Sequence, residues 1–239
     1  MKKGTTIDVL DHGFVRYIDH LGSDERICEA ARISYRAPSK GPEQDKKLIE
    51  YLWKNRHTSP FEMAKITFNI KMPIFVMRQY VRHRMQNLNE VSARYTELPN
   101  EFYIPKEWRK QDTKNKQGSV VDEDWNKKEC GSSKNENLSF IVEQQCFNAY
   151  KLYQDLLDMG VAREMARIVL PLNIYTEIYT TWDLNNLLKF IVLRDDKHAQ
   201  SEIQKYAQAM KIVGRELFPF TFGAYEKYKF TLTETPPNE

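Results

Sequence analysis

The sequence predicts an α+β fold in one domain, with a mixed or antiparallel sheet flanked by helices. Its 239 residues are enough for a single domain with a buried core. Strand-like and helix-like segments are mixed along the chain, without the regular strand–helix alternation that builds a parallel sheet. No internal repeat divides the chain, so residues 1–239 are treated as one unit.

The N-terminal quarter predicts a strand or hairpin followed by two helices. Residues 7–19 alternate loosely between apolar and polar side chains, which favours extended structure. Ser23 then caps a helix with acidic residues in its first turn. A second helix is expected at about 43–55. The segment HTSPFE at 57–62 is expected to turn, because Pro60 disfavours helix at the residue before it.

The next segments predict a strand and a helix that end in a cluster of basic residues. Residues 64–71 alternate and predict a strand. Pro73 opens a helix with the sequence PIFVMRQYVRHR, in which Gln79 and Arg82 share a face because they lie three residues apart. The polar stretch 85–98 is expected to be irregular or extended.

The second half of the chain begins with a segment unlike the rest. Residues 106–137 contain 15 charged residues among 32 and few aliphatic ones, which predicts a solvated or disordered loop without an assigned function. After it the sequence predicts mainly helices. The expected elements are a long amphipathic helix at 138–159 ending at Gly160, a short helix at 161–170, a strand at 173–182, helices at 183–195 and 198–215, and a last short helix after Pro219.

Charge and cysteine content exclude several classes of protein. A net charge of +3 is too small for a strongly basic nucleic-acid-binding protein, so the basic residues are expected to act locally in a pocket. No apolar run is long enough to span a bilayer, and the N-terminus lacks the apolar core of a secretory signal. Three widely spaced cysteines fit neither a disulfide framework nor a metal site. We therefore expect a reduced, cytoplasmic protein with no bound metal.

The densest chemical signal is Arg82-His83-Arg84 and the polar residues after it. Three basic side chains in a row favour a nearby anion. Such a triplet at a helix C-terminus is also explained by capping, because the helix dipole attracts cations there. The following residues favour a phosphorylated, hydrogen-bonding ligand such as a nucleotide, since they supply amides, a hydroxyl, a carboxylate and another guanidinium: Asn87, Asn89, Glu90, Ser92 and Arg94.

Two further basic pairs have the spacing of one helical face. Arg163 and Arg167 lie four residues apart, as do Arg194 and His198. Both pairs fit an anion site. Taken alone, each pair is better explained by surface ion pairs with neighbouring acidic residues, which contribute little to stability.

Five ordered blocks of this sequence resemble the flavin-dependent thymidylate synthases. The central one is Arg82-His83-Arg84 followed, after seven residues, by Ser92. The resemblance extends from about residue 7 to about residue 220 and implies the thymidylate synthase-complementing-protein fold. The blocks are HTSPFE (57–62), MPIFVMRQYVRHR (72–84), NEVSARY (89–95), AREMARIVLPLNIYT (162–176) and LRDDKHAQSEIQKYA (193–207).

The resemblance implies a site for dUMP that is shared between subunits of a homotetramer. It assigns Gln79, Arg82 and Arg167 to one chain. The neighbouring chain is expected to supply Arg194, the catalytic arginine at the uracil ring, where a fixed guanidinium stabilises developing negative charge. That chain also contributes the phosphate-binding segment, which consists of Glu90, Val91, Ser92, Ala93 and Arg94.

The resemblance also implies FAD as the cofactor, with NADPH and methylene-tetrahydrofolate as co-substrates. The reduced nicotinamide reduces the flavin, the folate supplies one carbon, and tetrahydrofolate is released with dTMP. His57 is expected at the opening for flavin and folate, although it also fits a helix C-cap. The expected FAD contacts are Ser59, Glu62, Arg82, His83, Arg84, Asn89, Glu90, Asp183, Asn185, Lys189 and His198.

The sequence departs from the family pattern at a few positions. Asp183, Asn185 and Lys189 replace residues that commonly contact the flavin, and Met63 stands where the family often has His. No cysteine is expected to act as a nucleophile, because none adjoins a base. Two other functions fit part of the pattern. A basic helix that docks RNA or DNA would show steep salt dependence, and a flavin oxidoreductase without methyl transfer would not need a dUMP site.

Overall fold

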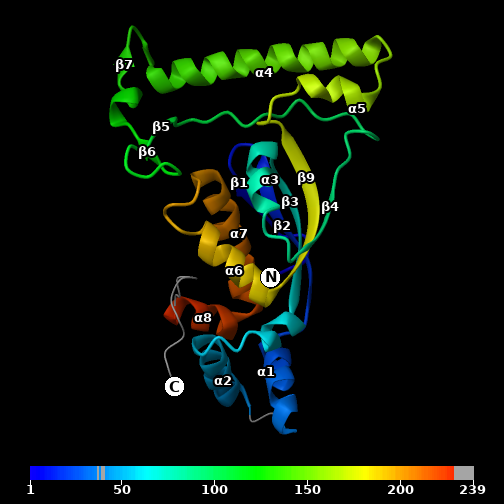
Figure 1. Ribbon diagram of the computed structural model, residues 1–239, viewed down its shortest axis with the longest axis vertical. Coiled ribbons are helices and arrows are strands. Elements are labelled where there is room, and N and C mark those ends of the chain that lie inside the picture. Colours follow the sequence, from blue (N-terminus) through cyan, green and yellow to red (C-terminus); the bar gives the residue numbers. More distant parts are fainter. Residues whose placement is uncertain (37, 39–40, 229–239) are drawn as a thin grey trace.

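The structure is a computed structural model that describes residues 1–36, 38 and 41–228 (Figure 1). Its centre is a five-stranded sheet with the order β1-β2-β3-β9-β4, and every neighbouring pair is antiparallel. The predicted α+β class and antiparallel sheet are therefore confirmed. The strands are β1 (Thr6–Val9), β2 (Gly13–Leu21), β3 (Lys65–Pro73), β9 (Tyr175–Asp183) and β4 (Asn87–Glu90).

Strand β9 organises the sheet because it pairs on both sides. It faces β3 along nine residues, from Lys65 opposite Asp183 to Pro73 opposite Tyr175. On its other side it carries the short edge strand β4, which ends with Glu90 opposite Ile178. The β-branched and aromatic residues of β9 favour this central position. The register consequently fixes the polar segment after the basic triplet at one edge of the sheet.

Six helices pack around the sheet and at one end of it (Figure 1). Helices α3, α6 and α7 contact β1, β2, β3 and β9, while α1, α2 and α8 contact one another. Large aromatic side chains fill the space between these helices and the sheet, among them Tyr80, Trp182, Phe190 and Phe222. The helices are α1 (Asp24–Arg32), α2 (Pro42–Lys54), α3 (Ile74–Tyr80), α6 (Leu184–Arg194), α7 (Ser201–Leu217) and α8 (Pro219–Lys227).

The longest helix, α4 (Lys134–Asp158), lies across the opposite end of the sheet from α1 and α2 (Figure 1). It begins with a capping box, in which Ser133 and Glu136 satisfy each other's backbone N–H groups. It ends before Gly160, whose φ of +82° makes it suitable as a C-cap. A second small core joins α4 to the segment after β4 through Cys146, Ala93 and Leu98.

Short elements connect these helices and strands. Helix α5 (Arg163–Ala166) follows α4 and lies beside it (Figure 1). None of the helices in the described ranges is both long enough and apolar enough to cross a membrane. The 3₁₀ helices are η1 (Ile33–Tyr35), η2 (Ser59–Met63), η3 (Glu123–Asn126) and η4 (Arg167–Val169), and the short strands are β5 (Arg109–Gln111), β6 (Ser119–Val121), β7 (Lys128–Glu129) and β8 (Ser132–Ser133).

The helix that opens after Pro73 is shorter than predicted. It ends at Tyr80, and the Arg-His-Arg triplet lies in the turns that lead into β4. The physical reason is that the triplet's central ring, His83, packs edge-on against Phe190, with 4.9 Å between ring centroids. Arg82 therefore lies beyond the helix, in a turn in which its backbone N–H donates to the carbonyl of Gln79 at 3.3 Å.

The charged segment 106–137 is structured, contrary to the prediction of a solvated or disordered loop. It forms the hairpins β5–β6 and β7–β8 and the first turn of α4. A buried ion pair ties it to the body of the protein, because Arg109 Nη2 lies 2.8 Å from Oε1 of Glu202. The partner residues are far apart in sequence, so local composition gave no sign of this contact.

The fold predicts opposite effects for two neighbouring glycine substitutions. A Cβ at Gly214 in α7 would lie 2.1 Å from the Phe222 ring, whereas a Cβ at Gly223 in α8 would meet no atom within 4 Å. We expect Gly214→Ala to destabilise the protein by about 1–3 kcal/mol through overpacking. We expect Gly223→Ala, the control, to stabilise it by about 0.4–1 kcal/mol. Urea unfolding of both variants tests this, and equal stabilities would contradict the packing of α7 on α8.

Candidate active site

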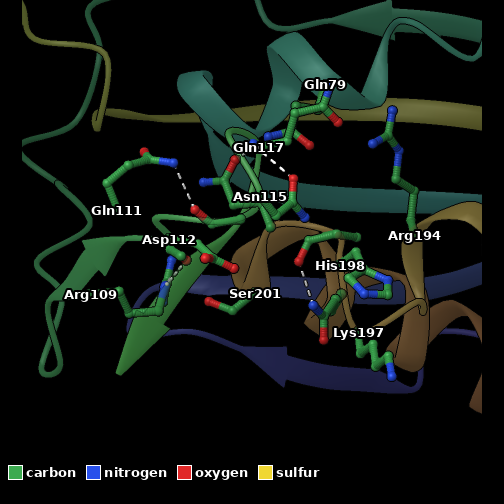
Figure 2. A pocket seen from close by; sticks show the side chains of 15 residues that line it. Gln79, Arg109, Gln111, Asp112, Asn115, Gln117, Arg194, Lys197, His198 and Ser201 are labelled. Carbon is green, nitrogen blue, oxygen red and sulfur yellow. Dashed lines mark hydrogen bonds between the residues drawn. The ribbon is translucent and has the colours of Figure 1, made fainter. Parts of the chain in front are cut away.

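All the residues expected to bind dUMP except Arg82 line one of two separate cavities in one chain. The Ser92 cavity has a volume of about 700 Å³ and lies between the segment after β4 and the segment 164–176. The Arg194 cavity has a volume of about 600 Å³ and lies among α3, the β5–β6 hairpin and the start of α7 (Figure 2). The predicted residues in the first are Glu90, Val91, Ser92, Ala93, Arg94 and Arg167; those in the second are Gln79, Arg194 and His198.

A short turn presents the polar side chains of the Ser92 cavity. The backbone N–H groups of Tyr95 and Thr96 both donate to the carbonyl of Ser92, at 3.0 and 3.2 Å. Ala93 is buried in the small core against α4, so it anchors the turn. A larger residue at this position would displace the turn, which explains why a small side chain stands between two polar ones.

The cationic groups of the Ser92 cavity are available to an anion. Arg94 pairs with Glu164 at 3.0 Å, but both side chains are more than half exposed, so the pair is weak and exchangeable. The Arg167 side chain makes no hydrogen bond or ion pair with any residue that the structure describes. Glu90 accepts a hydrogen bond from Thr176 at 2.7 Å, which fixes its carboxylate beside the cavity. This arrangement suits a phosphate next to a hydroxyl-bearing ligand.

The Arg194 cavity is organised around a contact between Arg194 and His83. Arg194 Nε donates to His83 Nε2 at 3.0 Å. Burial, together with the charge of Arg194, lowers the pKa of His83 to about 4. The ring is therefore neutral near pH 7 and its Nε2 atom accepts, which orients the guanidinium without repelling it. Burial also lowers the pKa of Arg194 itself.

The same cavity includes residues that the sequence did not identify as functional. Gln79 Nε2 donates to Gln200 Oε1 on one side of the cavity. The β5–β6 hairpin forms another wall, and Figure 2 shows it on the opposite side from Arg194. No periodicity or motif in the charged segment marked these positions. The hairpin residues that line the cavity are Arg109, Gln111, Asp112, Asn115, Gln117, Gly118 and Ser119.

The residues expected to contact FAD are distributed over several elements. Arg82, Arg84 and Asn89 are exposed along the path from α3 into β4. In the described ranges, the guanidinium groups of Arg82 and Arg84 have no hydrogen-bond or ion-pair partner. Ser59 and Glu62 lie in η2 and are exposed, so Glu62 is accessible from solvent. The two guanidinium groups are therefore available to an anionic ligand.

Three residues expected to contact the flavin lie at the start of α6. Two of them form hydrogen bonds within the protein, and the third is exposed. Asp183 caps α6, and its two oxygens accept from the backbone N–H and side-chain amide of Asn186 at 2.9 and 2.8 Å. Asn185 is only 2% exposed and donates to Glu62 at 3.0 Å. Its Oδ1 atom is buried without a hydrogen-bond partner among the described residues. Lys189, by contrast, is exposed on α6.

The two other histidines expected at the site are accessible. His57 is exposed after α2, and its ring lies edge-on to Tyr51 with 5.8 Å between centroids. Its backbone N–H donates to the carbonyl of Leu52 at 2.9 Å. His198 is exposed and lies 2.9 Å from Asp196, with Nδ1 facing the carboxylate.

The grouping of the arginines differs from the one that the resemblance implied. Arg167 was expected to act with Gln79, and Arg194 with Ser92. In the structure Arg167 lines the Ser92 cavity, while Arg194 lines the same cavity as Gln79. The reason is topological: Arg167 follows α5, which contacts α4, whereas Arg194 ends α6, which contacts α7. In the proposal below, Arg167 is therefore grouped with Ser92, and Arg194 with Gln79.

Two of the three cysteines are buried, and burial makes their thiols less acidic. Burial raises the pKa of Cys28 to about 12, and burial also raises the pKa of Cys146. Neither thiol is thus a ready nucleophile. Among residues 1–36, 38 and 41–228, no three His, Cys, Asp or Glu side chains gather as they would around a metal ion.

Comparisons with known proteins agree on one family. The family model described as thymidylate synthase complementing protein, Thy1, matches residues 16–220. A flavin-dependent thymidylate synthase of Thermus thermophilus is 46% identical over 233 residues, which cover 95% of this chain and 81% of that protein. One of Thermosipho africanus is 45% identical, covering 93% of this chain and 94% of its own length.

A solved structure extends the likeness to three dimensions. The UMP/dUMP methylase PolB of Streptomyces cacaoi, bound with 5-bromo-dUMP, is 31% identical and superposes with a TM-score of 0.80. The match covers 93% of this chain and 98% of that one. The chain therefore belongs to the thymidylate synthase complementing protein family, and it is an enzyme of that family.

Proposed function

We propose that this single-domain protein methylates dUMP to dTMP, with FAD as cofactor, methylene-tetrahydrofolate as carbon donor and NADPH as reductant. Its relatives are named flavin-dependent thymidylate synthases, and its structural neighbour is a dUMP methylase. The observation that carries the proposal is the pair of cavities. One offers the guanidinium of Arg167, which has no partner among the described residues, and the weakly paired Arg94, both of which suit a phosphate. The other holds a fixed guanidinium that suits a polar heterocycle.

The Ser92 cavity would hold the sugar and phosphate end of dUMP. Arg94 would exchange its exposed Glu164 partner for the phosphate, because a charge-assisted bond to phosphate is stronger than a solvated surface pair. Arg167 needs no such exchange. The hydroxyl of Ser92 would donate to the phosphate, and Glu90, fixed by Thr176, would accept from the ligand.

Arg194 would act on the uracil ring as the catalytic residue. A guanidinium beside the ring stabilises negative charge that develops during attack at the carbon to be methylated. The neutral acceptor His83 holds Arg194 Nε, so the two terminal nitrogens remain available to the ring. Because the guanidinium is half-buried, its charge is less screened than that of a surface arginine.

The flavin would supply the hydride that reduces the transferred carbon. The residues present fit an anionic dinucleotide, since Arg82 and Arg84 are exposed and unpartnered among the described residues beside the Arg194 contact. Arg82 and Arg84 would bind its pyrophosphate, while His83 separates them sterically from the uracil site. Glu62 would accept hydrogen bonds from the polar edges of the dinucleotide, and Asn89 would donate to them or accept from them.

The two cavities would combine between copies of the chain in a homotetramer. Strand β4 lies between the basic triplet and Ser92. Its residues alone span about 13 Å, at 3.3 Å for each residue. One chain therefore offers the two sets at the opposite ends of a strand, which a neighbouring copy could bring together. The rim of the Ser92 cavity supports this, because Ile168 and Leu172 are 76% and 63% exposed.

Helix α4 offers a further surface for such an assembly. Phe140 and Phe147 are 62% and 58% exposed and lie seven residues apart, which puts them on one helical face. Large apolar side chains exposed together on a helix are typical of interfaces between subunits. Helix α4 also contacts α5 and η4, the elements that carry Glu164, Arg167 and Ile168 of the Ser92 cavity.

The proposed activity predicts a yellow protein that forms dTMP from dUMP only with methylene-tetrahydrofolate, NADPH and FAD together. We expect Arg194→Ala to lower the rate of dTMP formation by about 10²-fold or more, because the fixed charge at the ring is lost. The bound flavin spectrum should stay that of the wild type. Chromatographic detection of dTMP is the assay, and a colourless protein that FAD cannot reconstitute would refute the proposal.

Shared sites predict recovery of activity when two inactive variants are mixed. Arg167→Ala and Arg194→Ala damage different sets, so some mixed assemblies contain an undamaged site. After unfolding and refolding together, random association should restore about a quarter of wild-type activity.

A matched control mixes Arg167→Ala with Ser92→Ala. These substitutions damage the same set, so every site keeps a defect and no recovery is expected. Equal activity in the two mixtures would show that each site is built within one chain.

The pKa of His83 predicts its titration and its effect on stability. We expect its ring to titrate near pH 4 in NMR spectra, assigned by comparison with His83→Gln. Unfolded chains bind the proton below about pH 6.5, but the folded protein does so only near pH 4. As the pH is lowered from about 6.5 to about 4, the free energy of unfolding should therefore fall more in the wild type than in His83→Gln. A midpoint between pH 6 and 7 would contradict the contact with Arg194.

A further inference from the structure

We propose that the β5–β6 hairpin, residues 109–121, recognises a ligand of the Arg194 cavity through the amides of Asn115 and Gln117. The inference rests on the proposed function, because it extends the same site. The ligand class is a planar heterocycle with a cyclic amide edge, in which a carbonyl stands beside an N–H. Uracil, the flavin ring and the pterin of folate all have this edge.

The hairpin is anchored at its base by a buried ion pair. Arg109 Nη2 donates to both carboxylate oxygens of Glu202, at 2.8 and 3.0 Å, and the Glu202 side chain is 4% exposed. Tyr103 donates to the same carboxylate at 3.2 Å. Burial alone would raise the pKa of Glu202, but the hydrogen bond and charge of Arg109 outweigh it and lower the pKa. The carboxylate therefore stays charged and holds the hairpin.

The hairpin is also ordered internally, up to its tip. Arg109 Nε donates to Ser119 Oγ at 2.9 Å, across the two strands. Gln111 Nε2 donates to the carbonyls of Lys116 and Gly118, both at 3.0 Å. These bonds set the position of the tip before any ligand binds, which lowers the entropy lost on binding.

Two amides of the tip remain free within the described chain. Asn115 Oδ1 accepts from the Gln117 backbone N–H at 3.0 Å, but Asn115 Nδ2 has no hydrogen-bond partner there. The Gln117 side chain has none at all. Both residues line the cavity and lie on its other side from Arg194 (Figure 2). An amide carries a donor and an acceptor together, so it complements a cyclic amide edge.

The electrostatic character of the cavity fits a neutral or weakly acidic ring. Arg194 and Lys197 bring positive charge to one side, while Asp112 is the acidic residue among those lining it. Gln79, Gln200 and Gln204 add further amides on the side of α3 and α7. A ring held between the hairpin and Arg194 would thus meet hydrogen-bonding groups along its edges and a cation that favours its carbonyl oxygens.

The test is the double variant Asn115→Ala/Gln117→Ala in the full-length protein. We expect the dissociation constant or KM of the ligand that the hairpin recognises to rise about tenfold, which corresponds to the loss of one or two neutral hydrogen bonds. Calorimetric dissociation constants for dUMP and for FAD, and the KM for methylene-tetrahydrofolate, distinguish the three sources. A loss confined to one of them identifies the ring that the hairpin contacts.

The control is Thr113→Ala, an uncharged substitution in the same hairpin that does not line the cavity. It should leave all three constants unchanged. Suppose that the wild-type protein binds dUMP and forms dTMP. If the double variant then has the same three constants as Thr113→Ala, the hairpin has no part in recognition. If the wild-type protein neither binds dUMP nor forms dTMP, the proposed function itself fails.

Arg109 tests whether the anchor positions these amides. Arg109→Lys keeps a positive charge for Glu202 but loses the Nε bond to Ser119. We expect Arg109→Lys to raise the same dissociation constant or KM as the double variant does, by a smaller factor. Its melting temperature should change little. Unchanged constants in Arg109→Lys would show that the anchor has no positioning role, and loss of all three equally would indicate general damage instead.

Discussion

The antiparallel pairing of β9 with β3 on one side and β4 on the other determines the rest of the site. Because β4 follows α3 directly and runs along β9, the basic triplet and Ser92 are held at opposite ends of one short strand. Beyond its two ends, β9 connects to the segments that carry Arg167 and Arg194. The sheet thereby separates two sets of polar residues that a single nucleotide would need together, and that separation is the reason for proposing a site shared between copies.

A second constraint is the neutral state of His83. The ring is partly buried, lies 4.9 Å from Phe190 and contacts Arg194, so a charged imidazole would be poorly solvated and repelled by that guanidinium. The low pKa of His83 removes that penalty and leaves Nε2 as an acceptor for Arg194. The Arg-His-Arg motif thus combines one fixed acceptor with two guanidinium groups that have no partner in the described part of the chain, which a helix-capping role would not require.

Local sequence signals predicted much of the fold. Ser23 and Gly160 were identified as helix ends from chemistry within a few residues of them, and the structure confirms both. The end of α3 and the order in the charged segment were missed, because their causes are Phe190 and Glu202, each about a hundred residues away in sequence. The resemblance identified residues in both cavities but not the hairpin wall of the Arg194 cavity. Within one chain, the packing of α5 on α4 and of α6 on α7 puts Arg167 beside Ser92 and Arg194 beside Gln79, a grouping that no local signal in the sequence indicates.

A shared site requires one bound nucleotide to touch two copies of the chain. A crystal or cryo-EM structure of the protein with dUMP and FAD would show whether it does. We expect Ser92, Arg94 and Arg167 of one copy to contact the phosphate, and Arg194 of another copy to contact the uracil. A nucleotide bound wholly within one copy, or with Arg194 directed away from the base, would contradict this expectation.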